Sequence, residues 1–153
     1  MKPTKSLRSR ALEILSRQEI SRAELKKKLA RHAESEEEIE AVINEFADRN
    51  WQSDERFAEA YIHSKSRRHG RLRLQQALAA KGVGADIVAP LLPGRNEELA
   101  AAVGVLEKKF AAPADNPANK LKQMRFLAYR GFDADTVRRA LKTAWQEDET
   151  ENG

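Results

Sequence analysis

The chain has 153 residues, with 28 Lys or Arg and 24 Asp or Glu, so its formal net charge at pH 7 is +4. It contains no Cys, which excludes disulfide scaffolds, thiolate nucleophiles and Cys-based zinc sites. Its apolar runs are too short for a membrane span, and the N-terminus MKPTKSLRSR leads into no signal-peptide core, so we expect a cytoplasmic protein.

Apolar residues recur at spacings of three and four along the whole chain, and no segment alternates apolar and polar residues over the length of a strand. This pattern predicts an all-α fold. Clusters of Ser, Asn, Asp, Gly and Pro separate about nine helices, several of which begin after a Ser or Asp that can cap them. The predicted helices cover residues 6–18, 21–31, 35–49, 53–69, 71–81, 84–92, 96–110, 117–130 and 133–147. Pro90 should shorten or kink the sixth of them.

The apolar frame repeats with a period of 49 residues. The series that share this spacing are Leu29, Leu78 and Leu127; Ile39, Val88 and Val137; Ile43, Leu92 and Leu141; and Leu12, Tyr61 and Phe110. Gly82 matches Gly131, and each is expected to close a helix in the left-handed conformation, whereas Ala33 stands there in the first repeat. Leu25 matches Leu74, although the third equivalent is Gln123.

The repeat predicts three tandem three-helix units that share interfaces in an elongated, curved array. We place the units at residues 1–50, 51–95 and 96–153, with an acidic, disordered tail ending the third. Residues 111–119 are the expected flexible connection, and Trp51 should pack between units.

Catalytic chemistry has little support in this sequence. The histidines are His32, His63 and His69, and the six-residue spacing of the last two does not place two metal ligands on one helix face. Phosphate-binding glycine loops are also missing. We therefore predict no enzyme activity, no catalytic residue, no metal and no cofactor.

Six cations and no carboxylate fall between residues 65 and 81, which is consistent either with a solvated surface or with a binding surface. Arg22, Arg71 and Lys120 lie 49 residues apart at predicted helix starts, where a cation is unfavourable, and this repetition favours an external partner. That partner could be nucleic acid phosphate or an acidic protein groove. The predicted basic track consists of Arg22, Lys26, Lys27, Lys65, Arg67, Arg68, Arg71, Arg73, Lys81, Lys120, Lys122 and Arg125.

Other prominent side chains are interpreted as structural. Lys28 is left out of the basic track because we expect it to lie toward the core. The aromatic residues at apolar positions of the repeat are expected in the core rather than stacked on bases: Phe57, Tyr61, Phe110, Phe126, Tyr129 and Phe132.

The segment NWQSDERFAEAYIHSKSRRHGRLRLQQALAAKGV at residues 50–83 resembles the central signature of the RecX family of recombinase regulators. SRAELKKKL at 21–29 and RFLAYRGFDADTV at 125–137 are similar to its first and last motifs. The resemblance spans nearly the whole chain, with three motifs in the right order. It assigns Asp54, Arg56, Phe57, Tyr61 and Ile62 to the family-like helix, and Lys65, Arg67, Arg68, Gly70, Arg71 and Lys81 to its basic continuation.

The resemblance implies binding to the RecA recombinase in the groove or at the end of its nucleoprotein filament. It implies inhibition of filament extension and of ATPase, recombinase and co-protease activities, and thus modulation of DNA repair and the SOS response. No membrane or small-molecule substrate is expected, and contact with single- or double-stranded DNA would be secondary. The alternative is a DNA-binding module of helix-turn-helix-like units that acts through phosphate contacts.

Overall fold

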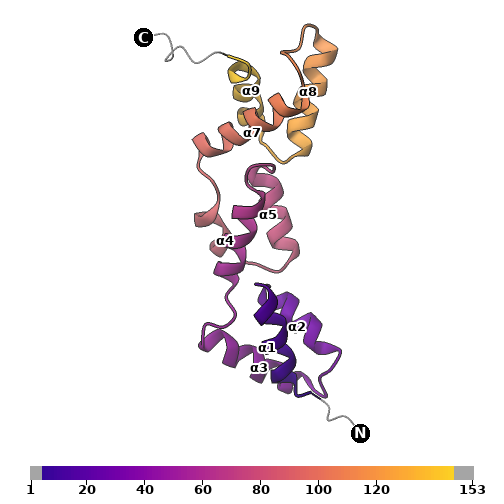
Figure 1. Ribbon diagram of the computed structural model, residues 1–153, viewed down its shortest axis with the longest axis vertical. Coiled ribbons are helices and arrows are strands. Elements are labelled where there is room, and N and C mark those ends of the chain that lie inside the picture. Colours follow the sequence, from indigo (N-terminus) through magenta and orange to yellow (C-terminus); the bar gives the residue numbers. More distant parts are fainter. Residues whose placement is uncertain (1–4, 147–153) are drawn as a thin grey trace. The chain divides into compact units, whose positions relative to one another are not determined.

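A computed structural model describes residues 5–146 of the chain, which form nine α-helices, one 3₁₀ helix and no strand (Figure 1). The helices are α1 (Leu7–Arg17), α2 (Arg22–Ala30), α3 (Glu36–Asp48), α4 (Asp54–Lys65), α5 (Arg71–Ala80), α6 (Ala85–Val88), the 3₁₀ helix η1 (Ala89–Leu91), α7 (Arg95–Lys109), α8 (Pro117–Tyr129) and α9 (Ala134–Thr143). The all-α prediction is confirmed over this range. The predicted disordered tail, residues 147–153, lies outside the described residues.

The chain divides into two compact units, one made of Met1–Tyr61 and Ala77–Leu91 and the other of Ile62–Gln76 and Leu92–Gly153. The division passes through α4 and α5, so the middle repeat contributes to both units. Contacts between the first and second repeats fall in the first unit, and contacts between the second and third repeats fall in the second.

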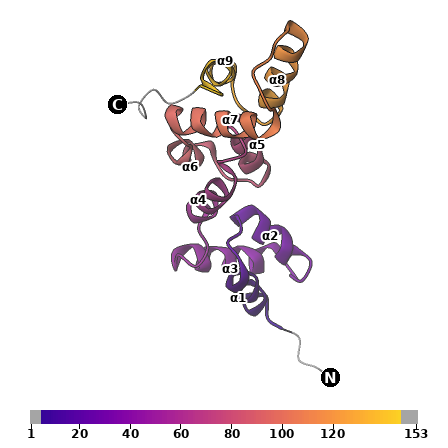
Figure 2. The same ribbon diagram turned by 45° about the horizontal axis from the view of Figure 1, so that its top comes forward.

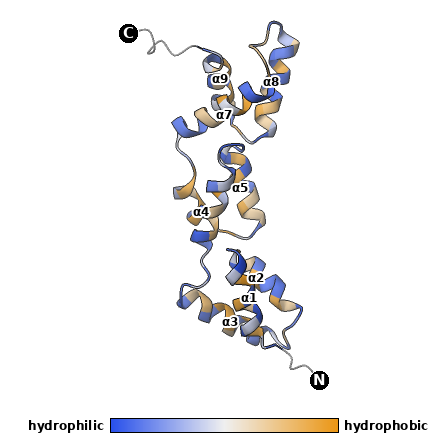
Figure 3. Cartoon of the chain, viewed as in Figure 1, coloured by the Kyte–Doolittle hydropathy of each residue, from blue (hydrophilic) through white to orange (hydrophobic). Residues whose placement is uncertain are grey.

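In the first unit, the apolar faces of α1, α2 and α3 turn toward one another, and polar residues cover the outside (Figure 3). Side chains of the serines that precede these helices accept hydrogen bonds from first-turn N–H groups, which are otherwise unpaired. The buried core residues are Leu7, Ala11, Ile20, Leu25, Leu29, Ile39, Val42, Ile43 and Phe46.

In the second unit, α7 packs against both α8 and α9 (Figure 2). Asn116 and Asp133 cap α8 and α9 through their side-chain oxygens. Gln123 takes the place of a repeat leucine and is buried, and its Nε2 donates to the Ala112 carbonyl at 3.1 Å. The buried core residues are Ala102, Leu106, Leu127, Phe132, Val137, Ala140 and Ala144.

Gly82 and Gly131 end α5 and α8 in the predicted left-handed conformation, with φ of 81° and 93°. The N–H of the next residue, Val83 or Phe132, donates to the carbonyl five residues earlier. This bond gives a hydrogen-bond partner to a carbonyl in the last turn of the helix. No residue near Ala33 has positive φ, and α2 ends instead in a tighter turn. The prediction for both glycines is confirmed.

Two helix ends differ from the sequence prediction. α4 stops at Lys65 rather than at residue 69, because Arg68 N–H turns back to the Lys65 carbonyl in a tighter turn that leads to Gly70. α9 stops at Thr143 rather than at residue 147, and Trp145 has φ of 63°, so Trp145 lies beyond the helix. The shortening expected at Pro90 is present, since α6 gives way there to η1.

Some side chains expected in the core are exposed. Tyr129 is 79% exposed, although its ring was expected in the core, and Leu12, the repeat equivalent of Tyr61 and Phe110, is also exposed. Trp51 packs on the first repeat rather than between units, with its ring edge-to-face against Phe46 at 5.3 Å. The Arg49 guanidinium lies 4.9 Å from the centre of that ring, so Trp51 is held by its own repeat.

Candidate basic interaction surface

The start of α2 is built into the junction between the first and second repeats. The Ser21 hydroxyl accepts from the Glu24 N–H and donates to the Lys81 carbonyl at 2.6 Å, so it joins the start of α2 to the end of α5. The Arg22 N–H donates to Oδ1 of Asp54 at 2.7 Å. Asp54 is the first residue of α4, so a carboxylate of the second repeat stabilises a helix start in the first.

The corresponding junction between the second and third repeats joins equivalent positions through a different donor. Gly70 follows Ser21 by 49 residues, and its backbone N–H donates to the Arg130 carbonyl at 2.8 Å, whereas the Ser21 hydroxyl donates to the Lys81 carbonyl. The Arg71 N–H points at Oε1 of Glu98, on α7, at 3.4 Å. A Cβ on Gly70 would overlap the Gly131 backbone, so glycine is needed here for close approach.

These junctions account for part of the cation pattern. Asp54 and Glu98 place carboxylates at the positive ends of α2 and α5, which offsets the cations Arg22 and Arg71 at those positions. Glu98 is only 4% exposed, and burial raises the pKa of its carboxyl. Lys120 is in the fourth position of α8 because that helix begins earlier, at Pro117. Arg22 and Arg71 are therefore balanced at these helix starts by carboxylates of the chain itself and do not require an external partner there.

Within the predicted basic track, five residues have partners in their own unit. Arg22 donates to Asn44 at 2.7 Å, and Arg71 donates to the Pro93 carbonyl at 3.2 Å. Lys26 pairs with Glu40 at 2.9 Å, and Lys81 lies 3.8 Å from Glu24. The Arg73 guanidinium lies over the exposed Tyr129 ring, 5.6 Å from its centre. These side chains are partly committed to holding the repeats together.

The other residues of the track form no ion pair or side-chain hydrogen bond with a described residue of their own unit. Six of them are exposed, and Lys65 is half-buried. They are Lys27, Lys65, Arg67, Arg68, Lys120, Lys122 and Arg125. We call these the free cations.

His69 lies among cations at the second junction. Burial, together with Arg73, Lys65, Arg130 and Arg68, holds the pKa of its imidazole below the usual range. Its Nδ1 is buried and has no hydrogen-bond partner among the described residues. A positive local potential therefore surrounds the turn between α4 and α5.

The structure also brings forward residues that the sequence interpretation missed. Lys28 is exposed, not directed to the core, and lines a hollow together with Arg10 and Arg31. Exposed Tyr129 stands beside Arg73. The 49-residue pattern does not predict their exposure, because the residue type changes along each series: Lys28 is equivalent to Ala77 and Phe126, and Tyr129 is equivalent to Arg31 and Ala80.

Between residues 5 and 146, no three His, Asp or Glu side chains are grouped so that they could hold a metal ion. Over the same range, no helix combines the length and apolar character required to cross a bilayer.

The fold and the charged surface define a tandem three-helix repeat protein whose repeats are joined through helix ends and whose surface carries free cations. Protein-family models match all three repeats: the RecX first three-helix domain at residues 8–46, the second at 53–92 and the third at 96–141. The chain belongs to the RecX family of regulatory proteins.

Individual relatives agree with this assignment. The chain is 67% identical to Regulatory protein RecX of Neisseria gonorrhoeae (strain NCCP11945), over 96% of each chain. It is 44% identical to Regulatory protein RecX of Chromobacterium violaceum, over 90% of each chain. A crystal structure of RecX from Lactobacillus salivarius superposes with a TM-score of 0.80 at 24% identity, covering 89% of this chain and 92% of the other, and so shows the same fold.

Proposed function

We propose that this chain is a cytoplasmic regulator that binds RecA and its nucleoprotein filament and inhibits filament extension, ATPase, recombinase and co-protease activities. By this route it modulates DNA repair and the SOS response, with no catalysis of its own. Membership of the RecX family supports the proposal. The observation that carries it is the turn after α4, where Lys65, Arg67 and Arg68 are free cations in the most positive part of the sequence.

Binding through these residues requires several contacts at once. A single exposed ion pair contributes about 0.2–1 kcal/mol, and salt screens it. A filament repeats the same surface at regular intervals, so a chain of tandem repeats can make several such contacts together. The residues bonded at the junctions hold neighbouring repeats together, and the free cations contact the partner.

The test is the steady-state ATPase rate of RecA on single-stranded DNA as the chain is titrated in, with filament length observed by electron microscopy. The wild-type chain should lower the rate and shorten filaments at well under one chain per RecA protomer. The variant Lys65→Glu, Arg67→Glu and Arg68→Glu should lose most of this inhibition because attraction becomes repulsion. These positions are preferable to Arg71 and Arg73, which support the second junction.

The matched control for that variant is a reversal of Lys108 and Lys109 to Glu, at exposed positions in the last turn of α7. This control should keep inhibition, and circular dichroism should show equal helicity in all variants. Full inhibition by the triple variant would contradict the assignment of this surface. Unchanged ATPase activity and filament length with the folded wild-type chain would contradict the proposed function itself.

A second candidate function is a DNA-binding module that acts through phosphate contacts. The observation that favours it is the exposed Tyr129 ring, which lies beside Arg73 and on the same helix as Lys122 and Arg125. An exposed aromatic ring among cations can stack on an unpaired base. Binding of labelled oligothymidylate in the absence of RecA would support this function. If all six cations of residues 65–81 contacted phosphates, the slope of log affinity against log salt concentration would approach about −4. Loss of that binding in Tyr129→Ala, with no RecA inhibition by the wild type, would favour this function over the first.

A further inference from the structure

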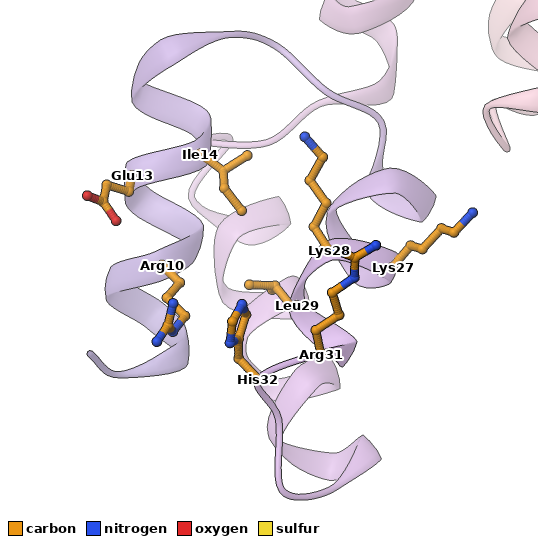
Figure 4. Close-up of a pocket in the computed structure, with 8 residues that line it drawn as sticks. All are labelled: Arg10, Glu13, Ile14, Lys27, Lys28, Leu29, Arg31 and His32. Carbon is orange, nitrogen blue, oxygen red and sulfur yellow. The ribbon is translucent and has the colours of Figure 1, made fainter. Parts of the chain in front are cut away.

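A hollow of about 540 Å³ lies in the first repeat between α1 and the end of α2 (Figure 4). Its floor is apolar, formed by half-buried Ile14 and fully buried Leu29. Arg10 and His32 stand on one side, and Lys28 and Arg31 on the other (Figure 4). The hollow thus combines an apolar base with a basic rim.

The rim charge is available to a ligand. Arg10, Lys28, Arg31 and His32 form no ion pair or side-chain hydrogen bond with any described residue of the first unit. The single carboxylate of the lining, Glu13, points away from the other side chains and pairs with Lys5 at 2.8 Å (Figure 4). Lys5 holds the pKa of that carboxyl below its usual range. The net potential of the hollow is therefore positive.

A second hollow adjoins the first. Lys27 and Lys28 line both, and the second is also lined by small apolar residues, among them Ala23, Ala77 and Ala80, and by Glu24, whose carboxylate lies 3.8 Å from Lys81. Lys27 points away from the first hollow (Figure 4). Two apolar depressions are thus separated by a pair of lysines, an arrangement that suits an extended chain with apolar side chains on either side of acidic ones.

The fold does not require these cations. The residues 49 positions after Lys28 and Arg31 are Ala77 and Ala80, and the next equivalents are Phe126 and Tyr129. The same helix therefore forms in the other repeats without charge at these positions. Positive charge at these two rim positions is a property of the first repeat alone.

We propose that the two hollows of the first repeat bind an extended acidic peptide segment of a partner protein, with aliphatic side chains over Ile14 and the alanines and carboxylates on the basic rim. The apolar floor favours a peptide over nucleic acid, since the depressions offer aliphatic contacts and lack a Phe, Tyr or Trp ring for base stacking. This proposal does not depend on RecA as the partner.

The test uses methyl and amide NMR spectra of the full chain with the probe peptide Ac-DELEDLE-amide. We expect saturable shifts at Ile14, Leu29 and Ala77, and about tenfold weaker binding to the variant Lys28→Glu, Arg31→Glu, because two attractions become repulsions. The Lys108→Glu, Lys109→Glu variant should bind like the wild type.

Two further ligands separate the alternatives. The peptide Ac-DESEDSE-amide has the same charge without leucine and should bind much more weakly, and a short oligothymidylate of similar charge should not shift the Ile14 methyl. Equal binding of both peptides would overturn the proposal in favour of plain charge attraction, and selective oligothymidylate binding would show a nucleic acid site. Absence of any shift at these residues with the leucine peptide would also overturn it, whatever the effect of the chain on RecA.

Discussion

Asp54 at the start of α4 accepts a 2.7 Å hydrogen bond from the backbone N–H of Arg22 at the start of α2. The same carboxylate oxygen accepts from Nε2 of Gln52 at 3.1 Å, and Gln52 also donates to the Ile20 carbonyl. One carboxylate thus caps a helix of the first repeat and orients the loop that leads into the second. The junction depends on a few polar atoms at helix ends.

Replacing Asp54 should therefore weaken the whole chain. Asp54→Ala leaves the Arg22 N–H without its acceptor, and we expect a loss of about 1–2 kcal/mol in the free energy of unfolding. Asp54→Asn keeps an oxygen acceptor and should lose less than half as much. Urea denaturation followed by circular dichroism measures both, and equal stability of all three proteins would show that the bond contributes nothing.

Gly131 should tolerate no side chain. Its φ is 93°, and a Cβ there would overlap the Arg73 backbone and side chain. We expect Gly131→Ala to destabilise the protein by about 2–4 kcal/mol, from the left-handed backbone and the overlap together. Gly104→Ala is the matched control, because it lies in the interior of α7 with open space around it, and it should stabilise by about 0.5–1 kcal/mol. Thermal melts of the two variants should move in opposite directions.

Stability should depend on pH through Glu98. Burial raises the pKa of this carboxyl in the folded chain above its unfolded value of about 4.3. Because the pKa is raised on folding, the protonated carboxyl contributes to the free energy of unfolding. That contribution is fully present below the pKa of the unfolded state and is lost as pH rises through the pKa of the folded state. The difference in unfolding free energy between wild type and Glu98→Gln should therefore shift in favour of the variant as pH rises from about 4.3 toward neutrality. Urea unfolding across this range tests the sign, and a shift toward the wild type would contradict it.

The imidazole of His69 should report the positive potential at the second junction. Its pKa is lowered by burial and by neighbouring cations that include Lys65. Lys65→Met should raise that pKa, and Lys65→Glu should raise it further, because each change makes the local potential less positive. NMR titration of the His69 ring protons measures the effect. A pKa that stays the same in both variants would mean that solvent screens Lys65 from the ring.

Much of the fold was predictable because the 49-residue repeat reports burial directly. Leu29, Leu78 and Leu127 are all fully buried, as their shared register predicted. Gly82 and Gly131 were predictable as helix ends because their conformation excludes most other residues. Both features can be read from the sequence, because one depends on the spacing of apolar residues and the other on the residue type at a single position.

The junctions could not be predicted in the same way. Asp54 and Glu98 perform matching roles, but they are 44 residues apart and occupy the first and fourth positions of their helices. Tyr129 and Lys28 were misplaced because periodicity gives the face of a helix, while exposure also depends on which neighbour covers that face. Whether the free cations contact a partner stays a prediction.

Trp51 provides the first repeat with an intrinsic optical probe. Its ring packs edge-to-face on Phe46, and the guanidinium groups of Arg8 and Arg49 lie 5.5 Å and 4.9 Å from its centre. Arg56 of α4 donates to the Trp51 carbonyl oxygen at 3.0 Å, so only the backbone of this residue is bonded to the second repeat. In a Trp145→Phe background, the wavelength of tryptophan emission therefore reports loss of the packing of the first repeat, readable during stopped-flow mixing with any partner.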